Sequence, residues 1–503
     1  MGTTTLDIGH YGHAAWDEAS RLDYVVDLNL NASPGTAFWF KIKDDWAPSD
    51  PLQRLESEPN DGDGSELVRA EFDDVTEEIP IVFGGTSVAQ VKLAIRALNR
   101  VFMLCRRFEK KKFGRAYYVR FGRSEVADDG WISRIKDGKL SFDGEAFWRI
   151  GAVQPFTLEA TLTIVREHYW EEDEDRSLQL TNGAGTGTTL QVFNHNDGDT
   201  AHDNWVRFTP DGGDMEAPLQ LVIANNFATD RIKRAWVSLH ELVDAAAIQN
   251  VWEGEALSAG STGGAGGATI VNQADATCSG GSRADITWTP GSAAAEVLLG
   301  WWRIQTSVLD AYNGRDLRML LRFQSQSYTD LWLRPRILYQ TNVATSYDAA
   351  TLWKGKEVKL VSAVALQDIG VVKLPPIRLR TLGYAEVDLC LFARAAASAH
   401  TIGLDNTFLL PTDGIRRLDA RSEGVGFGNA ASLIDDSRVG EIYTLLAAGK
   451  LPGFTALGEP LACRPGVQTY LYFNFLSNLG NGEIARTANI TVKTRYRRRT
   501  IGS

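Results

Sequence analysis

The chain has 503 residues, 44% of them hydrophobic, and a formal net charge of −11 at pH 7. It is too long for one hydrophobic core, so about two to four domains are expected. The sequence argues against three classes of protein. No apolar run is long enough to span a bilayer, and the negative net charge argues against bulk nucleic-acid binding. The four cysteines are isolated, so they match neither the ligand spacing of a metal site nor a dense disulfide framework.

The first 80 residues alternate between apolar runs and acidic, turn-rich segments. The runs at 24–30 and 37–42 alternate apolar and polar residues and predict strands. The segment 57–64 is rich in acidic residues, but its aspartate and glycine spacing does not fit an EF-hand loop. A solvated loop is therefore expected there. The N-terminal residues show no basic and then apolar pattern, so no signal peptide is predicted.

Residues 87–107 predict one long helix. Ser87 and Gln90 form a capping-box pattern at its start. Apolar residues then recur at alternating spacings of three and four, and further apolar residues widen that face beyond an ordinary stripe. Lys92, Arg96 and Arg100 form a charged ridge, and Arg106 and Arg107 are also expected to be solvated. A helix this apolar is expected to be covered from two sides.

Charge is unevenly distributed around this helix. Residues 17–78 contain 17 acidic and 5 basic residues, whereas residues 92–123 contain 11 basic residues and one acidic residue, Glu109. Such segregation suits contacts between unlike surfaces of neighbouring copies.

The segment after the helix predicts antiparallel strands. A strand is expected at 116–121, and residues 131–142 read as a hairpin with a type I′ turn at Asp137 and Gly138. Residues 156–166 place Leu158, Leu162 and their apolar neighbours on one face and polar residues on the other, which is typical of a half-buried strand. The acidic block at 171–175 predicts a domain boundary.

From residue 178 onward, short strand-like runs recur between glycine- and serine-rich intervals, which predicts β-sandwiches. One short helix is expected near 239–248. We expect three regions: a β domain at 1–177 with the helix at 87–107, a first sandwich at 178–250 with pieces added by the following region, and a second sandwich at 251–503. The predicted strands are 189–193, 204–208, 219–224, 234–239, 297–304, 317–323, 331–339, 357–365, 386–393, 469–475 and 487–496.

Candidate chemical sites are few. His195 and His202 lie among three aspartates, but their spacing fits no helix-borne ligand pair, and ordinary turn chemistry explains the segment better. No Gly-x-Ser-x-Gly motif, Cys–His arrangement or singled-out carboxylate pair is visible, so no catalytic residue, metal or cofactor is predicted.

Two other groups of residues invite binding hypotheses. Four tryptophans could stack on sugars, although core filling is the simpler interpretation: Trp301, Trp302, Trp332 and Trp353. The arginine-rich run at 495–499 is expected to be a solvated tail or to pair with acidic residues of a neighbouring chain.

Residues 80–170 resemble the N-terminal domain of the distal tail proteins of long-tailed bacteriophages. The resemblance rests on the segment 80–102, on the aromatic strand from Ala116, on the predicted turn at Asp137 and Gly138, and on the run from Leu158 to Trp170. Looser similarity to phage tail sequences is found in NHNDGD (194–199), GDMEAPLQLVIAN (213–225), LDNTFLLP (404–411) and RPGVQTYLYF (464–473).

The resemblance implies a mainly β protein, with a belt-type N-terminal β domain that carries one inserted helix and with C-terminal sandwiches of jelly-roll or galectin-like type. It implies a structural, non-enzymatic virion protein, assembled in the host cytoplasm, that forms a ring, typically a hexamer, at the distal end of the tail tube. The implied partners are the tail tube protein, a tail hub or tail-associated protein and the tape-measure protein. Neither membrane insertion nor specific nucleic-acid binding is expected.

The helix then acquires a role in assembly, with its own sheet on one side and a neighbouring subunit on the other. The candidate interface residues are Lys92, Arg96, Leu98, Arg100 and Phe102. Two alternatives stay open: a carbohydrate- or receptor-binding tail protein whose partner is a host surface glycan, and a β-sandwich carbohydrate-active enzyme.

Overall fold

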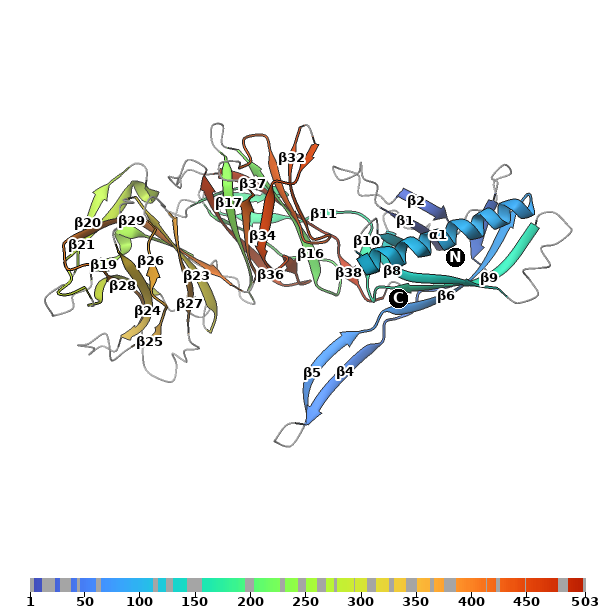
Figure 1. The fold of residues 1–503 in the computed structure, drawn as a ribbon, viewed down its shortest axis with the longest axis horizontal. Coiled ribbons are helices and arrows are strands. Elements are labelled where there is room, and N and C mark those ends of the chain that lie inside the picture. Colours follow the sequence, from blue (N-terminus) through green and yellow to red (C-terminus); the bar gives the residue numbers. More distant parts are fainter. Residues whose placement is uncertain are drawn as a thin grey trace. The chain divides into compact units, whose positions relative to one another are not determined.

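The computed structural model shows a mainly β protein with one long helix. It describes residues 4–10, 23–27, 38–42, 46–59, 65–111, 116–123, 130–142, 156–194, 203–226, 231–242, 250–259, 268–275, 278–293, 295–304, 314–324, 330–340, 351–361, 366–374, 386–412, 414–421, 426–447, 449–477 and 487–500. The contacts divide the chain into two units (Figure 1). Unit 1 comprises residues 1–176, 211–217 and 494–503, and unit 2 comprises residues 177–210 and 218–493.

Unit 1 contains a nine-stranded sheet and a separate two-stranded hairpin. The sheet follows the order β2 (Asp23–Asp27), β1 (Thr4–His10), β7 (Tyr117–Arg123), β8 (Gly130–Ser141), β9 (Phe156–Arg166), β6 (Val75–Gly85) and β3 (Phe38–Ile42), with β10 (Trp170–Glu172) beside β8 and β38 (Arg497–Arg498) beside β10. The hairpin consists of β4 (Gln53–Pro59) and β5 (Ser65–Phe72), and it leads away from the sheet in Figure 1. The helix α1 (Val88–Lys111) packs against β8, β6, β3 and β9.

The predicted capping pattern is present at the start of α1 in a modified form. The backbone N–H of Gln90 donates to the Ser87 hydroxyl at 3.3 Å, as a capping box requires. The Gln90 side-chain oxygen, however, accepts from the backbone N–H of Thr86 at 2.9 Å, one residue earlier than expected. The helix runs four residues beyond the predicted end at 107.

The prediction of a hairpin at residues 131–142 is wrong. Residues 130–141 form the single strand β8, which pairs with β7 on one side and β9 on the other, with a bulge between Ile135 and Asp137. Gly138 is needed for space: a Cβ atom there would lie 2.5 Å from the Phe102 ring of α1. Gly138 therefore allows the helix to pack closely against β8, and it does not mark a turn.

A buried ion pair lies on the face of this sheet that the helix covers. Arg166 and Glu77 are 0% and 2% exposed, and the guanidinium donates to the carboxylate at 2.7 Å. Arg166 also donates to the backbone oxygen of Ser49 at 2.8 Å and lies over the Trp170 ring at 4.3 Å. Because nearly every polar group has a partner, the cost of burying two charges is offset.

Unit 2 contains two sandwiches, each made of two antiparallel sheets (Figure 1). In the first sandwich, one sheet follows the order β11 (Arg176–Ser177), β37 (Thr487–Thr494), β16 (Ala217–Asn225), β31 (Ser432–Asp436), β32 (Glu441–Leu446) and β33 (Gly449–Leu451), with β14 (Thr189–Phe193) beside β37 and β35 (Ala462–Cys463) beside β16. The other follows the order β13 (Gly185–Gly187), β12 (Leu180–Asn182), β15 (Trp205–Phe208), β36 (Gln468–Ser477), β17 (Ile232–Leu242), β30 (Gly414–Ala420) and β34 (Phe454–Gly458).

The second sandwich is built from residues 251–411. Its first sheet follows the order β20 (Thr269–Ala274), β21 (Ser282–Trp288), β29 (His400–Pro411), β23 (Asp316–Phe323) and β27 (Leu366–Lys373), with β18 (Val251–Glu253) beside β29. Its second sheet follows the order β19 (Ser258–Ala259), β22 (Val297–Ile304), β28 (Glu386–Arg394), β24 (Trp332–Gln340) and β25 (Thr351–Lys354), with β26 (Val358–Lys359) beside β24. Two short 3₁₀ turns, Gly254–Ala256 and Ser279–Gly281, join strands of this region.

Most strands predicted after residue 178 are present, and two predictions there are wrong. Residues 239–242 belong to β17, which pairs with both β30 and β36, and not to a helix; residues 243–248 lie outside the described residues. The run 357–365 contains only the two-residue strand β26 among its described residues. The later strands β30–β37 belong to the first sandwich, to which the sequence prediction added unspecified pieces of the region after residue 250.

Candidate functional site

One side of α1 is buried in unit 1. Its buried residues are 0–8% exposed and recur at helical spacing: Val91, Ala94, Ile95, Leu98, Val101, Phe102 and Cys105. Burial raises the pKa of the Cys105 thiol to about 12, so this cysteine stays protonated. Next to this cysteine, Arg106 pairs with Asp137 and donates to the backbone oxygen of Gly138 at 2.8 Å. These contacts hold α1 in one orientation on the sheet.

The opposite side of α1 is a cationic surface that also exposes two large apolar side chains. Leu93 is 51% exposed and Met103 is 60% exposed. We call this surface the outer side of α1, and its exposed residues are Lys92, Leu93, Arg96, Asn99, Arg100, Met103 and Arg107. Single exposed apolar side chains are common on protein surfaces, so the run of exposed cations is what distinguishes this side of the helix.

The structure separates the five candidate interface residues into two groups. Lys92, Arg96 and Arg100 lie on the outer side of α1. Leu98 and Phe102 are 0% and 1% exposed in the core of unit 1, so their influence on any interface acts through the fold. The sequence prediction counted Leu93 among the residues that widen the apolar face, which is wrong because Leu93 is exposed, and it did not consider Met103; both lie on the same side of α1 as Arg96 and Arg100.

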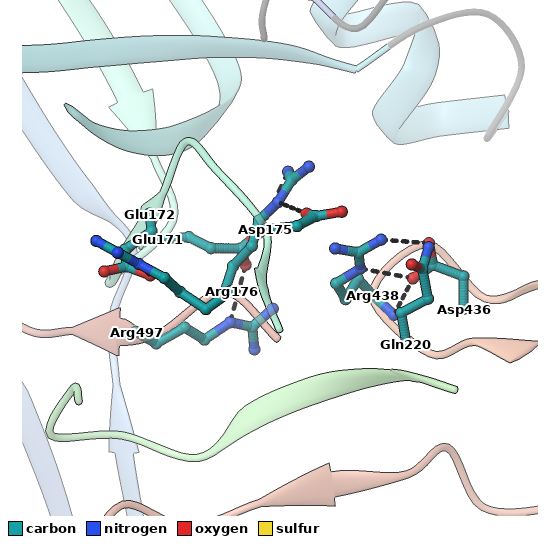
Figure 2. A network of polar contacts seen from close by, with 9 residues as sticks. Glu171, Glu172, Asp175, Arg176, Gln220, Asp436, Arg438 and Arg497 are labelled. Carbon is teal, nitrogen blue, oxygen red and sulfur yellow. Dashed lines mark hydrogen bonds and ion pairs between the residues drawn. The ribbon is translucent and has the colours of Figure 1, made fainter. Parts of the chain in front are cut away.

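The arginine-rich run at the end of the chain pairs within its own chain, which corrects the expectation of a solvated tail or a partner chain. Figure 2 shows Arg497 against Glu171, where the two side chains form an ion pair at 3.0 Å. Arg495 pairs with Asp175 at 2.7 Å. Arg497 also lies 4.1 Å from the centre of the Tyr169 ring. Residues 495–497 are thereby fixed to the segment that follows β9.

Other residues of Figure 2 belong to unit 2. There Asp436 accepts from Gln220 at 2.7 Å and pairs with Arg438 at 2.6 Å. This group connects β16 with the end of β31. It is explained by strand pairing and needs no ligand.

The four tryptophans do not form one platform. Trp301 and Trp302 are neighbours on β22 and therefore point to opposite faces of the sheet. Trp302 is 1% exposed, lies in the core and donates its ring N–H to the Glu253 backbone oxygen at 3.1 Å; Trp353 also packs against this core. Trp301 and Trp332 are half-buried on the outer face of the sheet that contains β22, β28 and β24.

Charged side chains surround these two tryptophans. Arg394 pairs with Glu357 through two hydrogen bonds of 2.7 and 2.9 Å. Glu296 pairs with both Arg334 and Arg336. Directly paired positions across antiparallel strands share one face, so these residues occupy the outer face defined by Trp332.

No metal-binding centre is found among the residues that the structure describes. They contain no group of three His, Cys, Asp or Glu residues that could hold a metal ion, and His195 and His202 lie outside the described residues. Burial raises the pKa of the Cys278 thiol to about 12, so it is not a nucleophile at neutral pH. None of the described helices is long and apolar enough to cross a membrane.

Comparisons with known proteins do not identify the chain. No family model and no curated protein matches it. Among solved structures, the Dit protein of phage SPP1, titled a paradigm of the hub adsorption apparatus of phages that infect Gram-positive bacteria, aligns over 98% of this chain and 99% of its own at 8% identity and a TM-score of 0.30.

Two further structures align less well. The VP2 subviral particle of infectious bursal disease virus covers 64% of this chain and 80% of its own at 9% identity and a TM-score of 0.17. An exo-β-1,3-galactanase from Phanerochaete chrysosporium covers 74% and 93% at 9% identity and a TM-score of 0.18. At such TM-scores none of these similarities carries an argument about the function of the chain.

Proposed function

We propose that the chain is a structural component of a bacteriophage tail that assembles with copies of itself into a ring at the distal end of the tail tube. Two observations carry the self-assembly: the exposed cations on the outer side of α1 and the acidic sequence of the hairpin β4–β5. The tail location is supported by the sequence resemblance of residues 80–170. The arguments from the structure follow one surface at a time.

The outer side of α1 is suited to an acidic partner surface. The helix contains seven basic residues and one acidic residue, and Lys92, Arg96 and Arg100 are exposed. Leu93 and Met103 add apolar area beside these charges. Apolar burial would supply most of the binding free energy, and the charges would select and orient the partner.

The hairpin β4–β5 forms a sheet of only two strands. A two-stranded hairpin is marginally stable alone in water, where stability requires a third strand or a packed face. Between Gln53 and Phe72 the sequence contains six acidic and two basic residues. A basic partner surface would therefore both stabilise the hairpin and match its charge.

Each copy thus offers a basic helix surface and an acidic hairpin. A contact between these unlike surfaces is heterologous, and repeated heterologous contacts give a ring when the rotation closes. Ring closure, a hexamer in the resembling family, and contacts with a tail tube protein, a tail hub protein and a tape-measure protein belong to this proposal, as does a location in the virion.

The proposal is tested with the double charge reversal Arg96→Glu and Arg100→Glu. We expect the variant to fold normally, because both side chains are exposed, and to assemble less than the wild type. Light scattering after size exclusion, at low salt and high protein concentration, measures the mass, and negative-stain electron microscopy shows whether rings form.

Lys139→Glu is the matched control. Lys139 is exposed on β8, and because its neighbour Gly138 faces α1, Lys139 points to the opposite face of the sheet. This variant should assemble like the wild type. A wild-type chain that stays monomeric under all these conditions, or a double variant that assembles as well as the control, would refute the proposed interface.

A further inference from the structure

The acidic hairpin β4–β5 is attached to the rest of unit 1 at its base, where β4 begins and β5 ends. We propose that Arg499 is a positioning residue for self-assembly: it contacts Phe72 at the end of β5 and thereby holds the hairpin in one direction. The effect on assembly rests on the proposed function, in which the hairpin is one of two contact surfaces. The contact itself lies within unit 1 and can be measured on a single copy.

The segment before β4 is held by a buried group. Ser49 donates its backbone N–H at 3.0 Å and its hydroxyl at 2.8 Å to the Glu77 carboxylate. Arg166 pairs with Glu77 and donates to the Ser49 backbone oxygen at 2.8 Å. Because Glu77 and Arg166 are buried, salt weakens this group little. This side of the base is therefore firmly attached to β6 and β9.

The end of β5 has weaker attachments. The half-buried Phe72 ring stacks on His168, with the ring centres 5.8 Å apart and an angle of 19° between the planes. The guanidinium carbon of Arg499 lies 4.5 Å from the centre of the Phe72 ring. Two residues further on, Asp74 pairs with Lys136 at 2.7 Å, but a partly exposed ion pair contributes little. Since an aromatic ring attracts a cation above its face, Arg499 adds a directional contact at the weaker side of the base.

Arg499 reaches Phe72 from a backbone that is fixed independently of the hairpin. β38 pairs with β10 through Arg497 and Glu171, whose side chains form an ion pair at 3.0 Å. The backbone N–H of Asp214 donates to the Arg497 backbone oxygen at 2.9 Å, and the Asp214 carboxylate accepts from the Arg499 backbone N–H at 3.0 Å. Because these bonds already order the backbone of Arg499, the contact with Phe72 costs little further entropy.

The neighbouring Arg498 supplies a matched comparison. Arg498 and Arg499 are both exposed, and each lies over an aromatic ring. Arg498 lies 4.7 Å from the ring centre of Trp131, and Arg499 lies 4.5 Å from that of Phe72. Trp131 belongs to β8 of the large sheet, whereas Phe72 belongs to the hairpin. Two arginines with the same charge and similar contacts therefore act on different parts of unit 1.

The direction of the hairpin matters because a two-stranded hairpin has little stability of its own. A base attached mainly through Ser49 would allow several directions, and the surface of a second copy would have to select one of them. Such selection lowers the apparent affinity by the fraction of chains in the competent conformation. The contact between Arg499 and Phe72 raises this fraction, so it should raise the affinity between copies even though Arg499 acts through the hairpin.

Hydrogen exchange of the full chain, measured by mass spectrometry, tests the contact on a single copy. At high salt and low protein concentration, where light scattering gives the mass of a monomer, Arg499→Ala should speed exchange of residues 53–59 and 65–72 about threefold. Exchange in β6 and β9 should not change. Arg498→Ala should leave exchange in the hairpin as in the wild type. Arg499→Lys, which keeps the cation, should restore most of the protection.

Self-assembly at low salt tests the effect on the interface. Arg499→Ala should need about threefold more protein for half-maximal assembly in light scattering, and Arg498→Ala should need as much as the wild type. In a Phe72→Ala background, Arg499→Ala should have no further effect on either measurement, because the ring that it contacts is absent. An effect of the lost charge alone would persist in that background.

Three results of the exchange experiment would overturn the positioning role. They are equal hairpin exchange in Arg499→Ala and the wild type, equal acceleration in Arg498→Ala, and an undiminished effect of Arg499→Ala in the Phe72→Ala background. Faster hairpin exchange with unchanged assembly would refute the role in assembly alone. A wild type that never assembles would refute the proposed function, and the exchange experiment would still decide whether Arg499 holds the hairpin.

Discussion

Unit 1 packs one long helix against its nine-stranded sheet, whereas unit 2 covers each of its sheets with another sheet. A helix against a sheet leaves its far side to the solvent, and in unit 1 this side exposes Leu93 and Met103. In the second sandwich the apolar residues of both sheets face one shared core, and its exposed outer face is rich in charged side chains. The difference predicts that assembly uses unit 1, whose helix keeps one side exposed.

The largest expected difference in the free energy of unfolding is between substitutions on the two sides of α1. Leu98→Asp places a charge in the core of unit 1 and should lower its free energy of unfolding by more than about 4 kcal/mol. Leu93→Asp lies on the outer side and should cost only about 0.5 kcal/mol. Hydrogen exchange measured by mass spectrometry reports each unit separately. Similar losses of protection in the two variants would show that α1 is buried on both sides of the isolated chain.

A smaller change in the free energy of unfolding, confined to unit 2, is expected when the pH is lowered. Burial, together with the nearby Arg315 charge, lowers the pKa of His240 to about 3, and the His240 Nδ1 lies 2.9 Å from an Arg315 nitrogen. The unfolded chain takes up this proton below pH 6.5, and the folded chain does not until about pH 3. His240 should therefore lower the free energy of unfolding by about 2 kcal/mol between pH 7 and pH 5.

His240→Asn isolates this contribution. Asp405 titrates in the opposite sense, since burial raises its pKa to about 6 and stabilises unit 2 as the pH falls. The informative quantity is consequently the difference between variant and wild type in urea unfolding at the two pH values. Parallel pH dependence of the variant and the wild type would contradict a neutral buried His240.

The smallest effect is expected at the start of α1. Ser87→Ala removes one acceptor for the Gln90 backbone N–H, and the contact between Thr86 and Gln90 remains. The cost should be about 0.5 kcal/mol, at the low end for a helix cap. Faster hydrogen exchange restricted to the first turn of α1 would agree with this expectation, and loss of protection throughout unit 1 would not.

Local patterns predicted much of the fold. The alternation at 156–166 gave the exact bounds of β9, and the spacing of apolar residues located α1, because both depend on neighbours along the chain. The errors arose where distant residues decide. Gly138 suggested a turn, but it is required by the Phe102 ring of α1, and residues 239–242 form a strand because they pair with β36, which is distant in the sequence.

The candidate site was predicted only where neighbours along the chain determine the position of a side chain. Exposure of Lys92, Arg96 and Arg100 follows from helical periodicity alone. The opposite directions of Trp301 and Trp302 could have been predicted from the two-residue period of a strand. The ion pairs around Trp332 could not, because they join residues from four separate stretches of the sequence.

The return of the chain from unit 2 to unit 1 has a consequence for the order of folding. Glu171 and Arg497, which pair in unit 1, are 326 residues apart in the sequence. During synthesis, the segment after β9 therefore waits for β38 while nearly all of unit 2 is made. Unit 2 is an insertion that can collapse on its own contacts first, and the edge of unit 1 at β10 closes last. A ribosome that stalls inside unit 2 would leave this edge open.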